Sequence, residues 1–227
     1  PSRNYRPVHS FVFTYSRLTL RLFTFSLLLA VPNALIAEEF PDNLFGYQQT
    51  ARANIGVFPQ WVRVLERHLA DNLHDGDCQG GEFNTCYMHE WLQFLNNIKE
   101  LSPSEQIRLV NRYANNKDYV LDFDNYGLED YWAIPHEFLF NGGDCEDYAI
   151  TKLLSLRWLG YSADKLRIVV LQDTNLRIAH AVLAFGADDD ILILDNQVEE
   201  VLSHQSIVHY VPVYSVSEFQ WWMHAPQ

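Results

Sequence analysis

The sequence predicts an α+β domain in which a helical half packs on an antiparallel β-sheet. Apolar residues recur with a period near 3.6 through residues 58–73 and 87–101, which indicates amphipathic helices. Beyond Gly160 the period falls to two or gives way to short apolar runs, which is typical of strands. Short turns such as residues 187–190 favour antiparallel neighbours. The expected strands are 166–172, 178–185, 191–195 and 208–216.

Three further helices have recognisable ends. The run Ser-Pro-Ser-Glu at 102–105 combines a capping box with proline at the first helical position, so a helix is expected to about Ala114. Pro135 opens a short helix that ends before the Asn-Gly-Gly at 141–143. The third is expected over 145–159, because the glycine that follows is a typical helix-ending residue.

Residues 1–37 differ from the rest of the chain and predict an export signal. They contain four arginines and no acid, an apolar run from Leu22 to Val31, and a small residue, Ala37, at the end. The run is shorter than the about 20 residues that span a bilayer comfortably, although an uncleaved N-terminal membrane anchor is the alternative. We therefore expect a signal peptide at 1–37 and a single domain at 38–227.

The charge of the chain restricts its partners. The formal net charge is −13, and removal of the four arginines of residues 1–37 changes it to −17. So acidic a domain is unsuited to nucleic acid or anionic lipid, and it suits an exported protein that binds divalent cations. No later apolar stretch is long enough for a membrane span, so no direct membrane insertion is expected once the signal is removed.

The chain has three cysteines, Cys78, Cys86 and Cys145. The first two flank a Gln-Gly-Gly turn, and in an oxidising compartment we expect them to form a disulfide. This pairing would leave Cys145 as a reactive thiol. The alternative is three buried, unpaired thiols.

Cys145 is the candidate nucleophile, because it opens a helix directly after a glycine turn. A helix start gathers free N–H groups and about half a unit of positive charge, which favours a thiolate and an oxyanion. His180 lies on one face of an apolar strand and Asp195 closes another. The order cysteine, histidine, aspartate is expected of a papain-like or transglutaminase-like site. The alternatives are a hydrogen-bonded core histidine and a strand-ending Asp-Asn turn.

Three carboxylates, Asp144, Glu146 and Asp147, surround the candidate nucleophile. Acids at a helix start stabilise the helix dipole, and this is the simplest reading of them. Three anions also raise the pKa of a neighbouring thiol, which opposes its activation. A bound hard cation would remove this conflict, and clustered carboxylates favour Ca²⁺ over zinc.

Two neighbouring runs are distinctive, DYWAIPHEFL at 130–139 and GGDCEDYAI at 142–150. Shorter runs of the same kind are Leu166-Arg167-Ile168, Ala179-His180, Leu194-Asp195-Asn196 and Pro212-Val213-Tyr214-Ser215. Together they resemble the bacterial transglutaminase-like cysteine proteinases of the LapG type, over about residues 60–217. The chain departs from the usual pattern in having two glycines rather than three before Asp-Cys. The pair Cys78 and Cys86 is also unusual.

The resemblance implies a periplasmic, calcium-dependent protease with a papain-like α+β fold. Its catalytic triad maps onto Cys145, His180 and Asp195. The acids on either side of the nucleophile, Asp144 and Glu146, belong to the calcium site of the family. Asp147 is expected as a third ligand from its position.

The resemblance also implies a substrate and a regulator. The substrate is a large surface adhesin that is cut near its N-terminus at a di-alanine site, which releases it and disperses biofilm. A LapD-like inner-membrane receptor for cyclic-di-GMP sequesters the protease through its periplasmic domain when the nucleotide is abundant. Trp132 lies in a motif that resembles the family's surface for that receptor, and a buried core tryptophan is the alternative.

Three functions are compatible with the motifs. The first is an endoprotease with Cys145 as nucleophile. The second is a transglutaminase-type acyltransferase, which shares the fold and the triad. The third is a non-enzymatic binding module on the same scaffold, and the presence of all three triad residues argues against it.

Overall fold

The computed structural model describes residues 40–71 and 86–226, which belong to one structural unit. The expected signal at 1–37 lies outside these residues. So does Cys78, and its disulfide with Cys86 therefore stays a prediction. Within the two described ranges, no helix is both long and apolar enough to cross a membrane.

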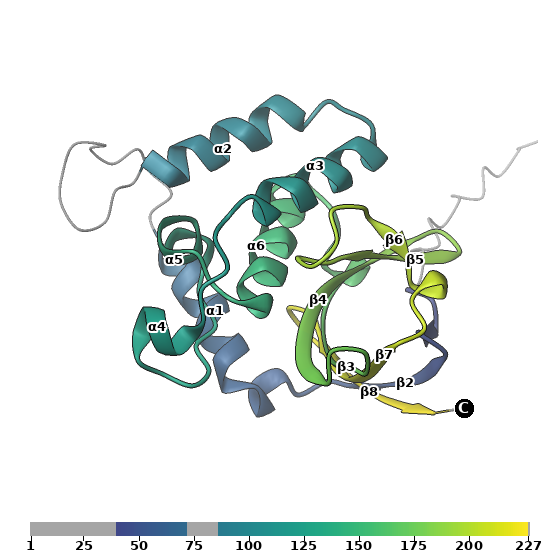
Figure 1. Cartoon of the computed structure of the whole chain (residues 1–227). Helices are drawn as coiled ribbons and strands as arrows, with labels where there is room; N and C mark the ends of the chain where they lie inside the picture. Colours follow the sequence, from purple (N-terminus) through teal and green to yellow (C-terminus); the bar gives the residue numbers. More distant parts are fainter. Residues whose placement is uncertain (1–39, 72–85, 227) are drawn as a thin grey trace, which may run out of the picture. The chain divides into compact units, whose positions relative to one another are not determined.

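The described strands form one curled sheet in which every pair of neighbours is antiparallel, in the order β1-β2-β8-β7-β3-β4-β5-β6 (Figure 1). Its strands are β1 (Asn43–Leu44), β2 (Tyr47–Arg52), β3 (Leu166–Asp173), β4 (Ile178–Ala187), β5 (Asp190–Leu194), β6 (Leu202–Ser203), β7 (Tyr210–Val216) and β8 (Trp221–Pro226). This sheet and the helices confirm the predicted α+β class.

Most of the helices lie between the first two strands and β3, as the periodicity predicted. They are α1 (Pro59–Ala70), α2 (Cys86–Ile98), α3 (Pro103–Asn115), α4 (Asp122–Tyr126), α5 (Pro135–Asn141) and α6 (Cys145–Trp158). Single 3₁₀ turns are η1 (Ile55–Val57), η2 (Ala163–Lys165) and η3 (His204–Ser206). The first helix ends at Ala70, where the chain turns to extended backbone at Asp71, rather than at the predicted residue 73.

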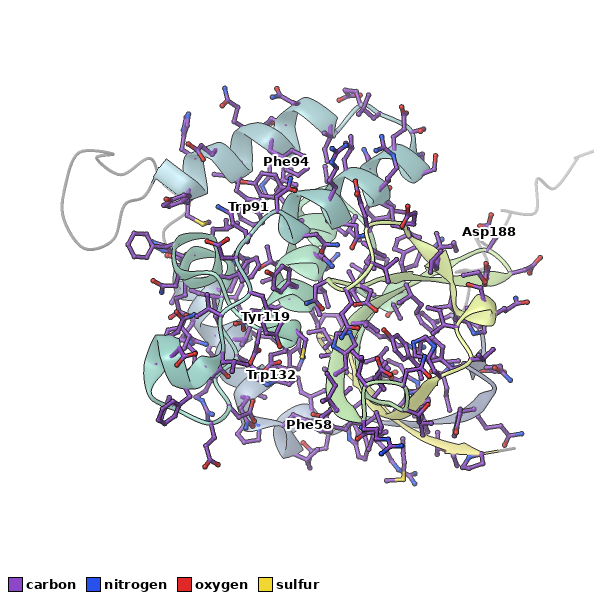
Figure 2. The ribbon with its side chains drawn as sticks, in the orientation of Figure 1. Phe58, Trp91, Phe94, Tyr119, Trp132 and Asp188 are labelled. Carbon is purple, nitrogen blue, oxygen red and sulfur yellow. The ribbon has the colours of Figure 1, made fainter. Side chains whose placement is uncertain are left out.

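Helix α6 is the centre of the domain and packs on β3 and β4 (Figure 1). From Asp147 to Leu156 every residue of this helix is buried, so the helix is covered on all sides. Trp91 of α2 anchors one of its faces, because its indole Nε1 donates a 2.9 Å hydrogen bond to Ser155 Oγ (Figure 2). A helix enclosed in this way holds its first residue in a fixed position against the sheet.

The two faces of the curled sheet bury separate apolar clusters. The larger cluster joins the helices to one face and includes Trp61, Phe138 and Leu153. The smaller cluster fills the concave face and includes Val169 and Tyr210. The residues that alternate along β3 and β4 are therefore buried on both faces, which gives these strands their near-continuous apolar sequences.

Four strands, β1, β2, β6 and β8, and one short helix, α4, were not predicted. β2 reads Tyr-Gln-Gln-Thr-Ala-Arg and is largely exposed, so it has no apolar alternation that would mark it as a strand. It forms because all six of its residues pair with β8. β1 and α4 are too short to give a periodic signal.

Candidate active site

A glycine turn sets the position of Cys145. Gly142 has φ 74° and ψ −170°, a conformation that is essentially restricted to glycine. A Cβ on Gly142 would also lie 2.5 Å from the carbonyl oxygen of Asp118, and one on Gly143 would lie 2.2 Å from Asp147 Oδ2. A side chain at Gly142 would therefore push the turn away from the segment of Asp118, and one at Gly143 would displace the Asp147 carboxylate.

The segment before α4 lies along this turn. The Val120 N–H donates to the Gly143 carbonyl at 2.9 Å, and the Gly143 N–H donates to the Asp118 carbonyl at 3.3 Å. These bonds form a parallel bridge between Tyr119 and Gly143. The bridge places residues that are about 20 positions upstream beside the start of α6.

Asp147 is fully buried and stabilises the start of α6. Its Oδ1 accepts a 2.7 Å hydrogen bond from the Ala133 N–H, and its Oδ2 accepts a 3.3 Å bond from the Asp144 N–H. The second bond is one half of a capping box, which satisfies a free N–H at the helix start. Asp147 therefore has a structural role whether or not it binds a metal.

Cys145 is a free, half-buried thiol at the first position of α6. Its Sγ donates a 3.2 Å hydrogen bond to Glu146 Oε2. The backbone N–H of Ala181 on β4 donates to the sulfur, which places the thiol beside the residue that follows His180. Burial raises the pKa of the thiol, and the negative charges of Glu146 and Asp144 raise it further. The conflict expected between thiol and carboxylates is therefore present.

His180 and Asp195 form a buried pair. Each is 3% exposed, and His180 Nε2 donates a 2.9 Å hydrogen bond to Asp195 Oδ1. They lie on and just after the paired strands β4 and β5. The same oxygen, Oδ1, accepts a 2.9 Å bond from the Gln197 N–H. The bond between His180 and Asp195 fixes the tautomer and the orientation of the imidazole, as predicted for a histidine–aspartate pair.

Tyr210, the first residue of β7, completes the surroundings of the Asp195 carboxylate. Its hydroxyl donates a 2.5 Å hydrogen bond to Asp195 Oδ2. Burial alone would raise the pKa of Asp195, but the hydrogen bonds from His180, Gln197 and Tyr210 hold it below its ordinary value. Asp195 is therefore ionised across the physiological range. Tyr210 was not predicted, because no local pattern separates it from the other eleven of the twelve tyrosines.

An acidic cluster joins the start of α6 to the segment around α4. The cluster contains two groups of three carboxylates, and Asp122 belongs to both groups. Within each group, every residue has one carboxylate oxygen that lies within 4.8 Å of an oxygen of each of the other two. The groups are Asp122, Asp130 and Glu146, and Asp122, Asp144 and Asp147. Two of these acids, Asp122 and Asp130, were not predicted, because five acids lie between residues 118 and 130 and nothing in the sequence separates them.

Without a bound cation, the ionised form of the acidic cluster is electrostatically unfavourable. Burial raises the pKa of Asp122 to about 6 and that of Glu146 to about 10, and neighbouring carboxylates contribute to both shifts. Burial also raises the pKa of Asp144, whose carboxyl group shares a hydrogen bond with Glu146, so that one of the two carries a proton. The Oδ1 atoms of Asp122 and Asp144 are buried and have no hydrogen-bond partner among the described residues. Such oxygens fit a hard cation such as Ca²⁺.

Lys152 is fully buried two turns along α6 from Cys145. Its Nζ lies 5.8 Å from the centre of the Tyr148 ring and has no hydrogen-bond partner within the described part of the chain. Burial lowers the pKa of Lys152 to about 7, and the negative charge of Asp195 limits the fall. A lysine inside a helix usually indicates an exposed face, so this burial could not be predicted from the sequence.

Substitution Lys152→Met is expected to raise the free energy of unfolding near pH 6 by about 1–4 kcal/mol, because a buried cation is replaced by an apolar chain of similar length. An unfolded lysine titrates near 10.4, so between about pH 7 and pH 10.4 the unfolded state holds the extra proton and stability rises with pH. The variant should lose this rise. Urea unfolding at a series of pH values measures both effects.

The control for this substitution is Lys99→Met, which removes an exposed lysine. It should leave the pH dependence of stability unchanged. A Lys152→Met protein that is less stable than the wild type at pH 6 would contradict the account of an uncompensated buried charge.

Trp132 is a core residue. It is 7% exposed, its ring centroid lies 6.3 Å from that of Trp61, and its indole Nε1 donates a 3.0 Å bond to Asp130 Oδ1 (Figure 2). The simpler of the two readings, a buried core tryptophan, is therefore confirmed. Its contact with Asp130 connects the core to the acidic cluster.

The chain is similar to one protein family and to several solved structures. The family model described as bacterial transglutaminase-like cysteine proteinase BTLCP matches residues 78–226. No curated protein sequence matches the chain. Among solved structures, the calcium-bound LapG of Legionella pneumophila is similar, with 28% sequence identity and a TM-score of 0.57 over 71% of this chain and 86% of that one.

Two further structures of the Legionella pneumophila protein match equally well. One carries no further description, and it has the same identity, coverage and TM-score as the calcium-bound form. The other is described as EGTA-treated, with 28% identity and a TM-score of 0.57 over 73% of this chain and 86% of that one. The family match runs from residue 78 to residue 226 and therefore includes α6, β4 and the other elements that carry the site residues.

Proposed function

Because the chain belongs to the bacterial transglutaminase-like cysteine proteinases, we propose that Cys145 is the nucleophile of a calcium-dependent endoprotease. The observation that carries the proposal is a free thiol at the start of α6 whose sulfur accepts a hydrogen bond from the N–H of Ala181, the residue that follows the buried, Asp195-bonded His180. Thiol, imidazole and carboxylate are the three groups that acyl transfer through a covalent intermediate uses.

Acylation begins with the loss of the Cys145 proton. His180 accepts it at Nδ1, because Nε2 is already bonded to Asp195. The sulfur then attacks the carbonyl carbon of the scissile peptide bond and forms a tetrahedral intermediate. The free N–H groups at the start of α6, including that of Cys145, stabilise its oxyanion.

His180 then returns its proton to the leaving amine, so the peptide C–N bond breaks and a thioester remains on Cys145. A water molecule gives a proton to His180 and adds to the thioester, which releases the new carboxyl end and restores the thiol. Asp195 orients the ring in each step and stabilises its charged form. It keeps its own negative charge throughout.

We propose that calcium binds in the acidic cluster, where Asp122 and Asp130 join the predicted ligands Asp144, Glu146 and Asp147. The unpartnered oxygens of two of these acids support this assignment, as do the calcium-bound and EGTA-treated forms of the similar LapG. The ion would supply the positive charge that offsets the carboxylates around the thiol. It would also hold the segment of α4 against the start of α6.

The substrate and the regulator are proposed from the resemblance of the motifs to the LapG type. The substrate is the N-terminal region of a large surface adhesin, and its cleavage promotes biofilm dispersal. The partner is a LapD-like receptor for cyclic-di-GMP in the inner membrane, which sets the place of action in the periplasm. The strong negative charge of the chain is compatible with this exported, calcium-rich setting.

The test is to incubate the protein with N-terminal adhesin fragments that contain a di-alanine site, with and without Ca²⁺, in water enriched in ¹⁸O. Hydrolysis is expected only with calcium, with ¹⁸O in the new carboxyl end and one new N-terminus. A dansylated amine is included to detect transamidation. Incorporation of this amine into glutamine without chain cleavage would contradict the protease and favour the acyltransferase. A Cys145 that fails to react with iodoacetamide would favour the binding module.

A further inference from the structure

The strongest feature that the proposed mechanism leaves unused is the hydrogen bond between Tyr210 and Asp195. Both residues are buried, at 4% and 3% exposure, and their oxygens are 2.5 Å apart. An ionised carboxylate only accepts hydrogen bonds, so the tyrosine hydroxyl donates. A length of 2.5 Å is typical of a charge-assisted O–H···O⁻ bond, which is stronger than a bond between neutral groups.

The two carboxylate oxygens of Asp195 have different partners. Oδ1 accepts hydrogen bonds from His180 Nε2 and from the Gln197 N–H. Among the described residues, Oδ2 accepts its hydrogen bond from the hydroxyl of Tyr210. The Tyr210 ring also meets the His180 ring edge to face, with centroids 5.8 Å apart. Tyr210 therefore touches both members of the pair, from a strand that neither of them occupies.

We propose that Tyr210 is a positioning residue of the active site. Its hydroxyl keeps the Asp195 carboxylate ionised and holds it in the orientation in which it accepts the hydrogen bond from His180. This inference rests on the proposed function of Cys145, His180 and Asp195. Tyr210 acts through Asp195 and neither gives nor takes a proton in the proposed mechanism.

The charged groups around Asp195 are consistent with this role. Lys152 of α6 is the buried cation that acts on Asp195, while Asp173 of β3 acts on Tyr210. His209 and Glu200 line a cavity of about 130 Å³ that also borders Asp195 and Tyr210. Burial and the neighbouring carboxylates raise the pKa of Tyr210, so its hydroxyl keeps the proton that it donates.

Loss of the hydroxyl leaves Oδ2 of Asp195 buried without a donor. The pKa of Asp195 should then rise by about one unit or more, because a hydrogen bond to the charged form has been removed. The carboxylate also becomes free to rotate away from His180. A weaker His180–Asp195 pair supports less thiolate, so Cys145 should react about tenfold more slowly at pH 7.

The experiment compares Tyr210→Phe with the wild type in calcium-containing buffer by two readouts that need no substrate. The first is the titration of the Asp195 carboxyl carbon by ¹³C NMR. The second is the rate at which iodoacetamide alkylates Cys145 at pH 7, measured by mass spectrometry of the peptide that contains it. Tyr210→Phe is expected to raise the Asp195 midpoint by about one unit and to slow alkylation about tenfold.

The matched control is Tyr161→Phe, which also removes a tyrosine hydroxyl that donates to a side chain, here from the half-buried Tyr161 to Gln106 Oε1 at 2.6 Å. This variant also loses a hydrogen bond within the protein, but neither readout should change. Replacement of Tyr210 by 3-fluorotyrosine keeps the ring and gives a more acidic hydroxyl. It should lower the Asp195 midpoint, and it tests the proposal even where Tyr210→Phe does not fold.

Each outcome decides one claim. A Tyr210→Phe protein in which either readout equals that of the wild type overturns the role of Tyr210. The substitution His180→Ala is measured in parallel and should slow alkylation at least as much. Alkylation at the wild-type rate in His180→Ala overturns the proposed triad instead, and the Asp195 titration still reports on the contact with Tyr210.

Discussion

Substitution Cys145→Ala is expected to reduce kcat/KM for cleavage of an N-terminal adhesin fragment by at least about 10³-fold, because it removes the only atom that forms the acyl intermediate. The fold should persist. The side chain is half-buried, and its contacts are one bond to Glu146 and one from the Ala181 N–H. Product formation followed by mass spectrometry, with circular dichroism on the same sample, measures both effects.

The control is Cys145→Ser, which keeps a hydrogen-bonding group of similar size at the start of α6. It should fold and bind calcium as the wild type does and should also be inactive, since a hydroxyl is far harder to ionise than a thiol. If Cys145→Ala cleaves the fragment at more than about one tenth of the wild-type rate, Cys145 is not the nucleophile.

Chelation with EGTA is expected to stop cleavage and to lower Tm by roughly 5–10 °C, which corresponds to calcium at about one hundred times its Kd. The physical reason is the acidic cluster, where Asp122 and Asp144 have buried oxygens without partners. Added Ca²⁺ should restore both properties. Mg²⁺ should restore them poorly, because it requires a tight octahedral arrangement of ligands.

The chelated protein should also show a distinct pH dependence. The pKa values of Asp122 and Glu146 are raised to about 6 and about 10, so between these values and the ordinary value near 4 the folded state holds more protons than the unfolded state. Stability in EGTA should therefore fall as the pH rises from about 4. Thermal unfolding at several pH values, with EGTA or with Ca²⁺, measures the difference.

The matched variants are Asp144→Asn and Asp188→Asn. Both remove one negative charge, but Asp188 lies on the turn between β4 and β5 with a positive φ that asparagine also accepts (Figure 2). Asp144→Asn should abolish the calcium-dependent rise in Tm, and Asp188→Asn should leave it intact. If calcium raises the Tm of the wild type and of Asp144→Asn equally, Asp144 is not a calcium ligand.

The parts of the site that follow local rules could be predicted from the sequence. Cys145 follows a glycine turn and opens a helix that Gly160 ends, so its position at a helix start needed no tertiary information. Alternation placed His180 on the inner face of its strand, and the end of the next apolar run placed Asp195 beside it. The hydrogen bond between them fits these predictions.

The parts that depend on distant contacts could not be predicted. Asp122 and Asp130 meet Glu146 because a bridge joins Tyr119 to Gly143, and no periodic pattern encodes that bridge. The burial of Lys152 depends on the elements that surround α6, because intrinsic preference places lysine at the surface. β2 is a strand because β8 and β1 pair with it, and its own sequence carries no strand pattern.

The most direct test of the central claim is to trap the acyl-enzyme. The protein is mixed with an adhesin fragment in Ca²⁺, stopped in acid during turnover and examined by mass spectrometry. The mechanism predicts a thioester that joins the N-terminal product to Cys145 and that disappears in Cys145→Ala. Rapid cleavage by the wild type with Cys145 unmodified at every time point, together with full cleavage by Cys145→Ala, would contradict it.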